Sequence, residues 1–318
     1  MDLEETRKKF AEFAKKNKKK KFVISTHAKA DVDAISSAFA VSSVFPNSIV
    51  VVPDEMNNQA KALAAKLEIK YQILTNLDKS KFDGLIVTDT SSYALIKPAK
   101  EWDVICIIDH HRADGRDMKA ENEFFDETAP SCAEFIASFL PKIKNENVAK
   151  ALCCGIIADT ARFKNGKIST FEMLTKLMKI AKMDYKEILA LGEYEYTTDS
   201  KIAILKAIQR STYYIIQDYV VVISEVGSNE SDASGILSDF VDVAFISSYK
   251  EKENECRVSS RGRRRVHVNL NEVMKEVAVS FGGNGGGHAK AAGCSIPGAN
   301  PQNVLMKCIE VFSRKAGN

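Results

Sequence analysis

The sequence predicts an α/β protein whose N-terminal half contains a doubly wound, mostly parallel sheet. Two observations support this prediction. Short runs rich in Val and Ile, at residues 22–26, 48–52, 84–88 and 103–108, are typical of parallel strands that are buried on both faces. Segments with helical periodicity separate these runs, and such an alternation indicates a parallel sheet covered by helices.

The expected elements follow one another along the chain. Helices of the first half are predicted at residues 33–45, 57–68, 92–96, 131–140 and 148–159. Residues 166–217 are interpreted as all-helical, with helices at 169–182, 185–193 and 199–214, the last being a rigid connector.

A second, smaller α/β domain is expected from residue 218 onwards. Its strands are predicted at residues 218–226, 241–250 and 255–262, and its helices at 231–240, 269–279 and 303–315. The predicted parts are therefore a first domain at 1–165, a helical connector at 166–217 and a second domain at 218–318, with the active-site cleft between the two domains.

Histidine and aspartate side chains follow four apolar segments of the first half. These residues are His27, Asp31 and Asp33 after the first segment, Asp89 after the second, Asp109, His110 and His111 after the third, and Asp159 after the fourth. Ligands of open α/β sheets bind outside the carboxyl ends of the strands. The eight side chains are therefore expected to converge on one crevice.

Five carboxylates packed together would repel one another unless cations neutralise them. Mixed imidazole and carboxylate ligands suit Mn²⁺, Zn²⁺, Co²⁺ or Mg²⁺, and eight candidates are enough for two ions with supporting groups. Two ions about 3.5–4 Å apart activate a water and stabilise a displacement at phosphorus. A single Asp after a strand is usually a turn residue or a helix cap. Here, however, three of the five histidines of the chain fall beside these acids.

The composition is that of an ordinary globular protein, with 318 residues, 45% hydrophobic and 27% charged, and a net charge of +3. This mild charge does not by itself indicate a nucleic-acid scaffold. No apolar run approaches the roughly 18 residues that span a bilayer. Residues 1–21 read as a charged amphipathic helix and not as a secretory signal, so a cytoplasmic protein without membrane contact is expected.

The ordered motifs resemble a known family. HAKADVD at 27–33, TDT at 88–90, IDHH at 108–111 and GIIADT at 155–160 resemble motifs one to four of the DHH phosphoesterase superfamily. GGNGGGHAKAAGCSI at 282–296 resembles the glycine-rich signature of the DHH-associated C-terminal domain, although Asn284 interrupts the glycines. VSSRGR at 258–263 lies where that domain carries its S-x-R element. The resemblance spans nearly the whole chain.

The resemblance implies two divalent ions, with Mn²⁺ as the expected metal and Mg²⁺ or Co²⁺ as alternatives. The ligands would be His27, Asp31 and Asp89 for one ion, and Asp33, Asp89, His110 and Asp159 for the other, with Asp89 bridging. Asp109 would orient a neighbouring imidazole, and His111 would contact the scissile phosphate or the leaving oxygen.

The second domain would bind the substrate. Five glycines at 282–287 are expected to form a loop, because glycine is costly inside a strand or helix. Residues 289–293 read as a helix start, where backbone N–H groups attract anions. The predicted binding residues are Arg261, whose guanidinium suits bidentate phosphate recognition, together with Gly285, Gly286, Gly287 and His288. Arg264 and Arg265 are read as a solvated turn.

The predicted substrates are short oligonucleotides (nanoRNA, pApA) and 3′-phosphorylated nucleotides such as pAp. RecJ-like single-strand exonucleases usually carry added binding modules and a strongly basic channel, and this chain shows neither. That activity and a non-catalytic scaffold of a replication complex remain as alternatives, although a scaffold would have lost metal ligands that are all present here. The sequence leaves open whether RNA or DNA is preferred and in which direction a strand would be degraded. It also leaves open whether the protein forms a homodimer.

Overall fold

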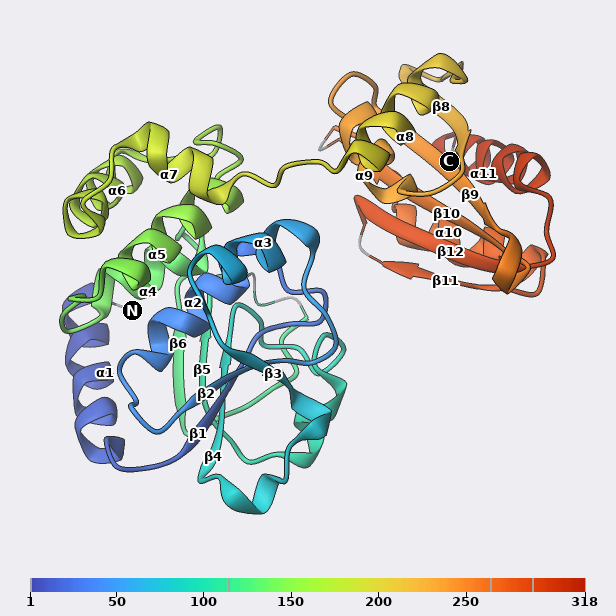
Figure 1. Cartoon of the computed structure of the whole chain (residues 1–318). Helices are drawn as coiled ribbons and strands as arrows, with labels where there is room; N and C mark the ends of the chain where they lie inside the picture. The colour runs from blue at the N-terminus through green and yellow to red at the C-terminus, as the bar shows by residue number, and fades with distance from the viewer. Residues whose placement is uncertain (1, 112, 114, 264, 288, 318) are drawn as a thin grey trace. The chain divides into compact units, whose positions relative to one another are not determined.

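The computed structural model describes residues 2–111, 113, 115–263, 265–287 and 289–317 (Figure 1). The chain divides into two compact units, Met1–Tyr194 and Glu195–Asn318. Within the described residues, no helix combines the length and the apolar character needed to cross a bilayer.

A six-stranded parallel sheet forms the centre of the N-terminal unit, with the order β3-β2-β1-β4-β5-β6. Its strands are β1 (Phe22–Ser25), β2 (Ile49–Val52), β3 (Tyr71–Ile73), β4 (Gly84–Thr88), β5 (Val104–Asp109) and β6 (Asn122–Phe125). The predicted parallel sheet is confirmed. Because β1 and β4 are neighbours although β2 and β3 separate them in the chain, the strand order reverses between them, and such a switch point is where ligands bind.

Helices of the N-terminal unit pack over one face of this sheet. They are α1 (Leu3–Asn17), α2 (Val32–Ser42), α3 (Asn58–Lys66), α4 (Cys132–Phe139), α5 (Glu146–Asp159), α6 (Ile168–Ala181) and α7 (Tyr185–Gly192). Their apolar side chains form one core with Ile24, Ile86 and Ile108 of the strands. Because side chains alternate along a strand, Val23 and Leu85 point to the opposite face and form a separate core.

That opposite face is covered by the short 3₁₀ helices η1 (Leu74–Asn76) and η3 (Lys97–Glu101), with η2 (Lys79–Lys81) between β3 and β4. The helix predicted at residues 92–96 is wrong, since this segment forms a turn that leads into η3. Five residues gain too few hydrogen bonds to repay helix nucleation, and Pro98 begins the next turn instead.

The boundary between the units falls inside the segment that the sequence predicts as a connector. Helices α6 and α7 pack against α5 of the N-terminal unit. Helix α8 (Thr198–Gln209) instead packs against α9 (Glu230–Leu237) and β8 (Tyr219–Val226) of the C-terminal unit. The predicted helix at 199–214 ends early, because residues 212–216 form strand β7. The sequence Thr-Tyr-Tyr-Ile-Ile is rich in the aromatic and β-branched side chains that favour strands.

The C-terminal unit contains a six-stranded mixed sheet with the order β11-β12-β10-β9-β8-β7. Its strands are β7 (Thr212–Ile216), β8 (Tyr219–Val226), β9 (Val243–Lys250), β10 (Glu255–Gly262), β11 (Asn284–Gly287) and β12 (Ala291–Pro297). One face packs against α8 and α9 (Glu230–Leu237), and the other against α10 (Leu270–Ser280) and α11 (Pro301–Ala316). The 3₁₀ helix η4 (Glu251–Glu253) links β9 to β10. The predicted second α/β domain is confirmed.

The glycine-rich segment is a strand, and the predicted loop followed by a helix is wrong. Strand β11 pairs antiparallel with β12, which occupies the expected helix start. A Cβ atom on Gly285 would lie 2.3 Å from the carbonyl oxygen of Met274 in α10, and one on Gly287 would lie 2.5 Å from that of Ala291. These glycines are therefore needed because neighbouring backbone lies against the strand.

Candidate metal centre

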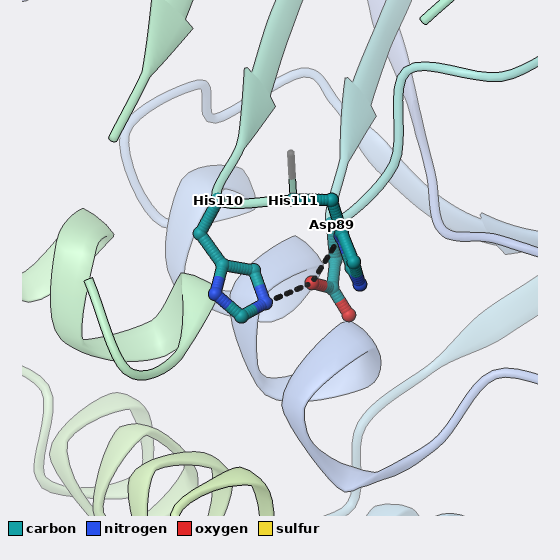
Figure 2. A group of neighbouring side chains, drawn as sticks. All are labelled: Asp89, His110 and His111. Carbon is teal, nitrogen blue, oxygen red and sulfur yellow. Dashed lines mark ion pairs between the residues drawn. The ribbon is translucent and has the colours of Figure 1, made fainter. Parts of the chain in front are cut away.

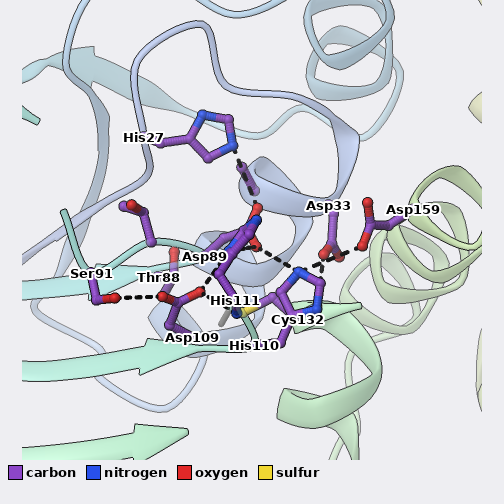
Figure 3. A network of polar contacts seen from close by, with 12 residues as sticks. His27, Asp33, Thr88, Asp89, Ser91, Asp109, His110, His111, Cys132 and Asp159 are labelled. Atoms are coloured by element: carbon purple, nitrogen blue, oxygen red, sulfur yellow. Dashed lines mark hydrogen bonds and ion pairs between the residues drawn. The ribbon is translucent and has the colours of Figure 1, made fainter. Parts of the chain in front are cut away.

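The carboxyl ends of three adjacent parallel strands bring the predicted side chains together (Figure 3). His27 follows β1, Asp89 follows β4, and Asp109 ends β5 directly before His110 and His111. Two helices supply the other carboxylates. Asp31 is the N-cap of α2, Asp33 lies in the first turn of that helix, and Asp159 is the last residue of α5.

Asp89 lies at the centre of the site, with imidazoles around it (Figure 2). His27 Nε2 is 3.5 Å from Asp89 Oδ2, and His110 Nε2 is 3.4 Å from Asp89 Oδ1. His111 Nδ1 lies 3.9 Å from the same Oδ1. Asp89 is buried, and its Oδ1 has no hydrogen-bond partner among the described residues. A buried carboxylate oxygen without a hydrogen bond is uncommon in proteins, and a bound cation is one way to satisfy it.

The backbone of Asp89 is strained, with a φ of 63°. Asp tolerates this left-handed conformation better than most residues, but it still costs free energy, and such strain is concentrated at functional sites. The Asp89 N–H donates to the carbonyl of Ile108 at 2.9 Å. This bond ties the turn after β4 to the end of β5, where the two histidines begin.

Three groups of side chains have ligand atoms within 4.8 Å of one another and could each hold an ion. They are His27 with Asp31 and Asp89, Asp33 with His110 and Asp159, and Asp89 with His110 and His111. The first two groups fit two neighbouring ions, and Asp89 is close enough to His110 to reach the second. All eight predicted residues of the N-terminal unit therefore lie in one place, while their individual ligand roles stay a prediction.

Backbone groups orient the two most buried imidazoles. His27 Nδ1 donates to the carbonyl of Ala28 at 2.8 Å, and His110 Nδ1 donates to that of Ala129 at 3.1 Å. Each contact leaves Nε2 turned toward Asp89. Metal-binding histidines usually carry such a bond on the second nitrogen, because it fixes the ring and its tautomer.

The N-terminus of α4 holds Asp33. Its two oxygens accept hydrogen bonds from the backbone N–H groups of Cys132, at 2.7 Å, and Ala133, at 2.9 Å. Gly155 in α5 leaves the space that the Asp33 carboxylate occupies, because a Cβ atom at this position would lie 2.9 Å from Asp33 Oδ1. Asp31 is fixed more locally, by accepting from the N–H of Ala34 at 3.0 Å.

Asp109 orients His111. Its Oδ1 accepts from His111 Nδ1 at 2.8 Å and from the His111 N–H at 3.1 Å, and its Oδ2 accepts from Ser91 Oγ at 2.8 Å. Asp109 is fully buried, whereas the His111 side chain is 58% exposed. His111 is therefore a rigidly held imidazole that still faces solvent.

The electrostatics of the site are those of a crowded, buried cluster. Burial raises the pKa of Asp33 well above its usual value, and the charges of Asp89 and Asp159 add to this effect. Burial also raises the pKa of Asp159 to about 6. For His27 and His110 burial opposes protonation, but contact with Asp89 outweighs it and raises their pKa values to about 9 and about 10. Divalent cations would replace these protons and remove the conflict between the acids.

Two supporting residues escaped the sequence prediction. Ser91, which bonds Asp109, stands just after the TDT motif, so its position was the available signal. Arg116 donates to the His111 carbonyl, forms a 3.1 Å ion pair with Glu127 and stacks 3.9 Å above the ring of Phe125. No local pattern marks Arg116, because the contacts that define it form only in the fold.

The predicted substrate-binding residues lie in the C-terminal unit. Arg261 in β10 donates to the Ser260 carbonyl at 3.2 Å and to Ser231 Oγ at 3.4 Å, and burial lowers the pKa of its guanidinium. Among the described residues it forms no ion pair with a carboxylate. Arg265, expected in a solvated turn, is exposed but ion-paired with Asp242 and Asp218.

Gly285, Gly286 and Gly287 belong to β11, which is an edge strand and so leaves backbone N–H groups unpaired by the sheet on its outer side. The helix dipole that the sequence predicted at this point is absent, because β12 follows. The predicted binding residue His288 and the predicted turn residue Arg264 lie outside the described residues.

The fold and the ligand cluster define the class, an α/β protein that gathers histidine and aspartate at the carboxyl edge of a parallel sheet. The DHH family, N-terminal domain matches residues 21–156, and the DHHA1 domain matches residues 218–316. An uncharacterized protein of Methanocaldococcus jannaschii is 31% identical over 288 residues, which are 85% of each chain. The chain therefore belongs to the DHH phosphoesterase superfamily, with the associated DHHA1 domain.

Solved structures show the same fold. An exopolyphosphatase-related protein of Bacteroides fragilis aligns with a TM-score of 0.75 and 15% identity, over 98% of this chain and 97% of its own. CDC45 of Entamoeba histolytica aligns with a TM-score of 0.53 and 8% identity, over 99% of both chains. At these identities the likeness concerns the fold alone.

Proposed function

We propose that this protein is a two-metal-dependent phosphoesterase that hydrolyses short oligonucleotides (nanoRNA, pApA), 3′-phosphorylated nucleotides such as pAp, or both, to mononucleotides. The observation that carries the proposal is Asp89, a buried carboxylate that belongs to one ligand group with His27 and Asp31 and to a second with His110 and His111. Such an arrangement is suited to a bridging ligand between two cations.

The proposed ligands are His27, Asp31 and Asp89 for one ion, and Asp33, Asp89, His110 and Asp159 for the other. Imidazole and carboxylate donors suit several divalent ions; the family resemblance makes Mn²⁺ the proposed metal, with Mg²⁺ or Co²⁺ as alternatives. When bound, the two ions would supply an activated water and neutralise charge on the phosphate. No side-chain nucleophile is then required.

The proposed role of His111 follows from its surroundings. Asp109 accepts a hydrogen bond from His111 Nδ1 at 2.8 Å and, itself fixed by Ser91, holds the ring in one orientation. The exposed imidazole can contact the scissile phosphate, and a protonated Nε2 can donate to the leaving oxygen. Arg116 would support this position from behind, because its guanidinium bonds the His111 carbonyl.

We assign the rest of the nucleotide to the C-terminal unit. Arg261 is a half-buried guanidinium whose polar contacts are a hydroxyl and a carbonyl, so its charge is available for a phosphate. The outward N–H groups of β11, at Gly285 to Gly287, would add donors, and His288 would join them. The mild net charge of +3 favours substrates with few phosphates over long single strands.

The test compares turnover of pAp, pApA, a 5-mer and a 24-mer oligonucleotide by the full-length protein, with Mn²⁺ and with excess chelator. The proposal expects mononucleotide from the short substrates, loss of activity with chelator, and kcat/KM that falls beyond about five nucleotides, because few contacts hold the chain. Efficient degradation of the 24-mer would instead favour a RecJ-like exonuclease. No turnover of any substrate with Mn²⁺ would favour the scaffold alternative.

A further inference from the structure

One short segment of the N-terminal unit, residues 126–133, holds two side chains of the candidate metal centre. The carbonyl of Ala129 accepts the hydrogen bond that orients His110, and two backbone N–H groups at the start of α4 hold the carboxylate of Asp33. Contacts of this kind fix the orientation of metal ligands. The spacing of His110 and Asp33 therefore depends on the 126–133 segment, although none of its own residues is a proposed ligand.

One lysine contacts both ends of this segment. The ammonium of Lys167 donates to the carbonyl of Thr128. Glu134, which follows the segment, is buried, and its Oε2 has no hydrogen-bond partner among the described residues. Burial raises the pKa of Glu134, while two hydroxyl groups of α6 and the positive charge of Lys167 oppose that rise. Because Lys167 is the N-cap of α6, the start of α6 fixes the 126–133 segment.

The start of α6 is also the end of the turn that follows Asp159. Three consecutive residues of this turn have left-handed backbones, with φ of 51° at Ala161, 54° at Arg162 and 68° at Phe163. Such residues adopt this conformation at a cost, so the surrounding structure must hold the turn in place. The ring of Phe163 stacks on that of Phe171 in α6, with 4.9 Å between the ring centroids. The position of Asp159 is therefore tied to the beginning of α6.

Asp33, His110 and Asp159 form one ligand group, and Figure 3 shows them close together, yet they come from α2, the end of β5 and the end of α5. We propose that Lys167 is the positioning residue of this group. It keeps the three side chains at the spacing that one ion requires, because it ends the turn after Asp159 and binds the segment that holds the other two. This assignment rests on the proposed two-metal function, in which the group binds one of the two ions.

The other ligand group is built without this lysine. His27 and Asp31 lie in one loop after β1, and a neighbouring backbone group holds each of them. Asp89, the third member, is held by its bond to the end of β5. None of these contacts involves Lys167. Loss of the Lys167 ammonium should therefore weaken one ion selectively, whereas a general loss of stability would weaken both.

The test compares the full-length wild type with Lys167→Met, which removes the ammonium, and with Lys167→Arg, which restores a cationic donor. Lys164→Met is the matched control, because Lys164 lies in the same turn and its exposed side chain has no polar partner among the described residues. Each protein is stripped by chelator and titrated with Mn²⁺ by calorimetry. Circular dichroism would confirm that all variants fold.

Lys167→Met should bind one ion with wild-type affinity and the other about tenfold more weakly, since changes to groups that orient metal ligands typically cost roughly 10- to 100-fold in affinity. Lys167→Arg should recover most of this loss, and Lys164→Met should match the wild type. Selective weakening of one ion together with recovery by arginine is a result that a merely structural role of Lys167 would not give.

Hydrogen exchange in the metal-free protein provides a readout that needs neither an ion nor a substrate. The N–H groups of Cys132 and Ala133 donate to Asp33. In Lys167→Met they should exchange about fivefold faster than in the wild type, as the loss of one hydrogen bond from the supporting structure predicts. Lys164→Met and Lys167→Arg should leave these rates close to those of the wild type.

The results separate the positioning role from the proposed function. A wild type that binds fewer than two Mn²⁺ ions would refute the two-metal function, and the exchange rates alone would then decide whether Lys167 holds the ligand group. With two ions on the wild type, equal weakening of both ions in Lys167→Met, or of neither, would overturn the positioning role. Unchanged exchange at Cys132 and Ala133 in Lys167→Met would overturn it in either case.

Discussion

Replacing Asp89 by Asn would remove the negative charge at the centre of the proposed metal site with little change in shape. Asn adopts the left-handed backbone of this position, with φ of 63°, about as readily as Asp. The variant should therefore keep the turn after β4. Because Asp89 takes part in two ligand groups, binding of both ions should weaken.

The expected size of the effect follows from the burial of Asp89. Removing one partner from a buried charged set costs about 3–5 kcal/mol. At about 1.4 kcal/mol for each factor of ten, this corresponds to a loss of roughly 100-fold to a few thousand-fold in metal affinity. Turnover at limiting metal should fall by at least as much.

Asp159→Asn is the matched control, because Asp159 belongs to one ligand group only. Isothermal titration with Mn²⁺, on protein first stripped by chelator, measures the affinity and the number of ions for each protein. Asp89→Asn should show weak binding throughout, whereas Asp159→Asn should keep one tight ion. Two ions bound to Asp89→Asn with wild-type affinity would refute the bridging role.

Three further outcomes are expected. Burial raises the pKa of Asp159 from 3.8 to about 6, so ionised Asp159 destabilises the metal-free fold as pH rises through this window. The melting temperature of metal-free Asp159→Asn should therefore exceed that of the metal-free wild type at pH 7 and equal it at pH 3.5. Gly285→Ala should cost about 1–3 kcal/mol in urea unfolding because its Cβ meets the Met274 carbonyl, whereas Gly286→Ala, with no atom nearer than 3.9 Å, should be neutral. Arg261→Ala should raise KM for pAp with metal content unchanged. Arg257→Ala is the control and should leave KM unchanged, because Arg257 is already paired with Glu253 and Glu255. Loss of metal in Arg261→Ala would count against assigning metal binding to the N-terminal unit and substrate binding to the C-terminal unit.

The convergence of the candidate ligands was predictable because each of their four groups follows an apolar segment. The end of a parallel strand fixes where the next side chain lies, so His27, Asp89 and His110 had to converge once their strands were neighbours. Asp159 follows the same logic from the end of a helix, because α5 packs against α2, which carries Asp33.

The errors arose where distant contacts decide the local structure. Glycine is unfavourable in an isolated strand, yet β11 forms because the backbone of Met274 leaves no room for a side chain at Gly285. Residues 212–214 continue the helical pattern of the sequence before them, but they form a strand because they pair with β8. Arg116 was missed because its partners, the His111 carbonyl and the ring of Phe125, lie in different segments.

The measurement that tests the central claim most directly is the dependence of turnover on bound metal. Protein stripped by chelator would be titrated with Mn²⁺ in the presence of pApA, and the release of mononucleotide would be followed together with the number of ions bound. Since Asp89 is shared by two ligand groups, activity should stay low up to one equivalent and rise to a plateau at two. Full activity at one equivalent, or without any metal, would contradict the account.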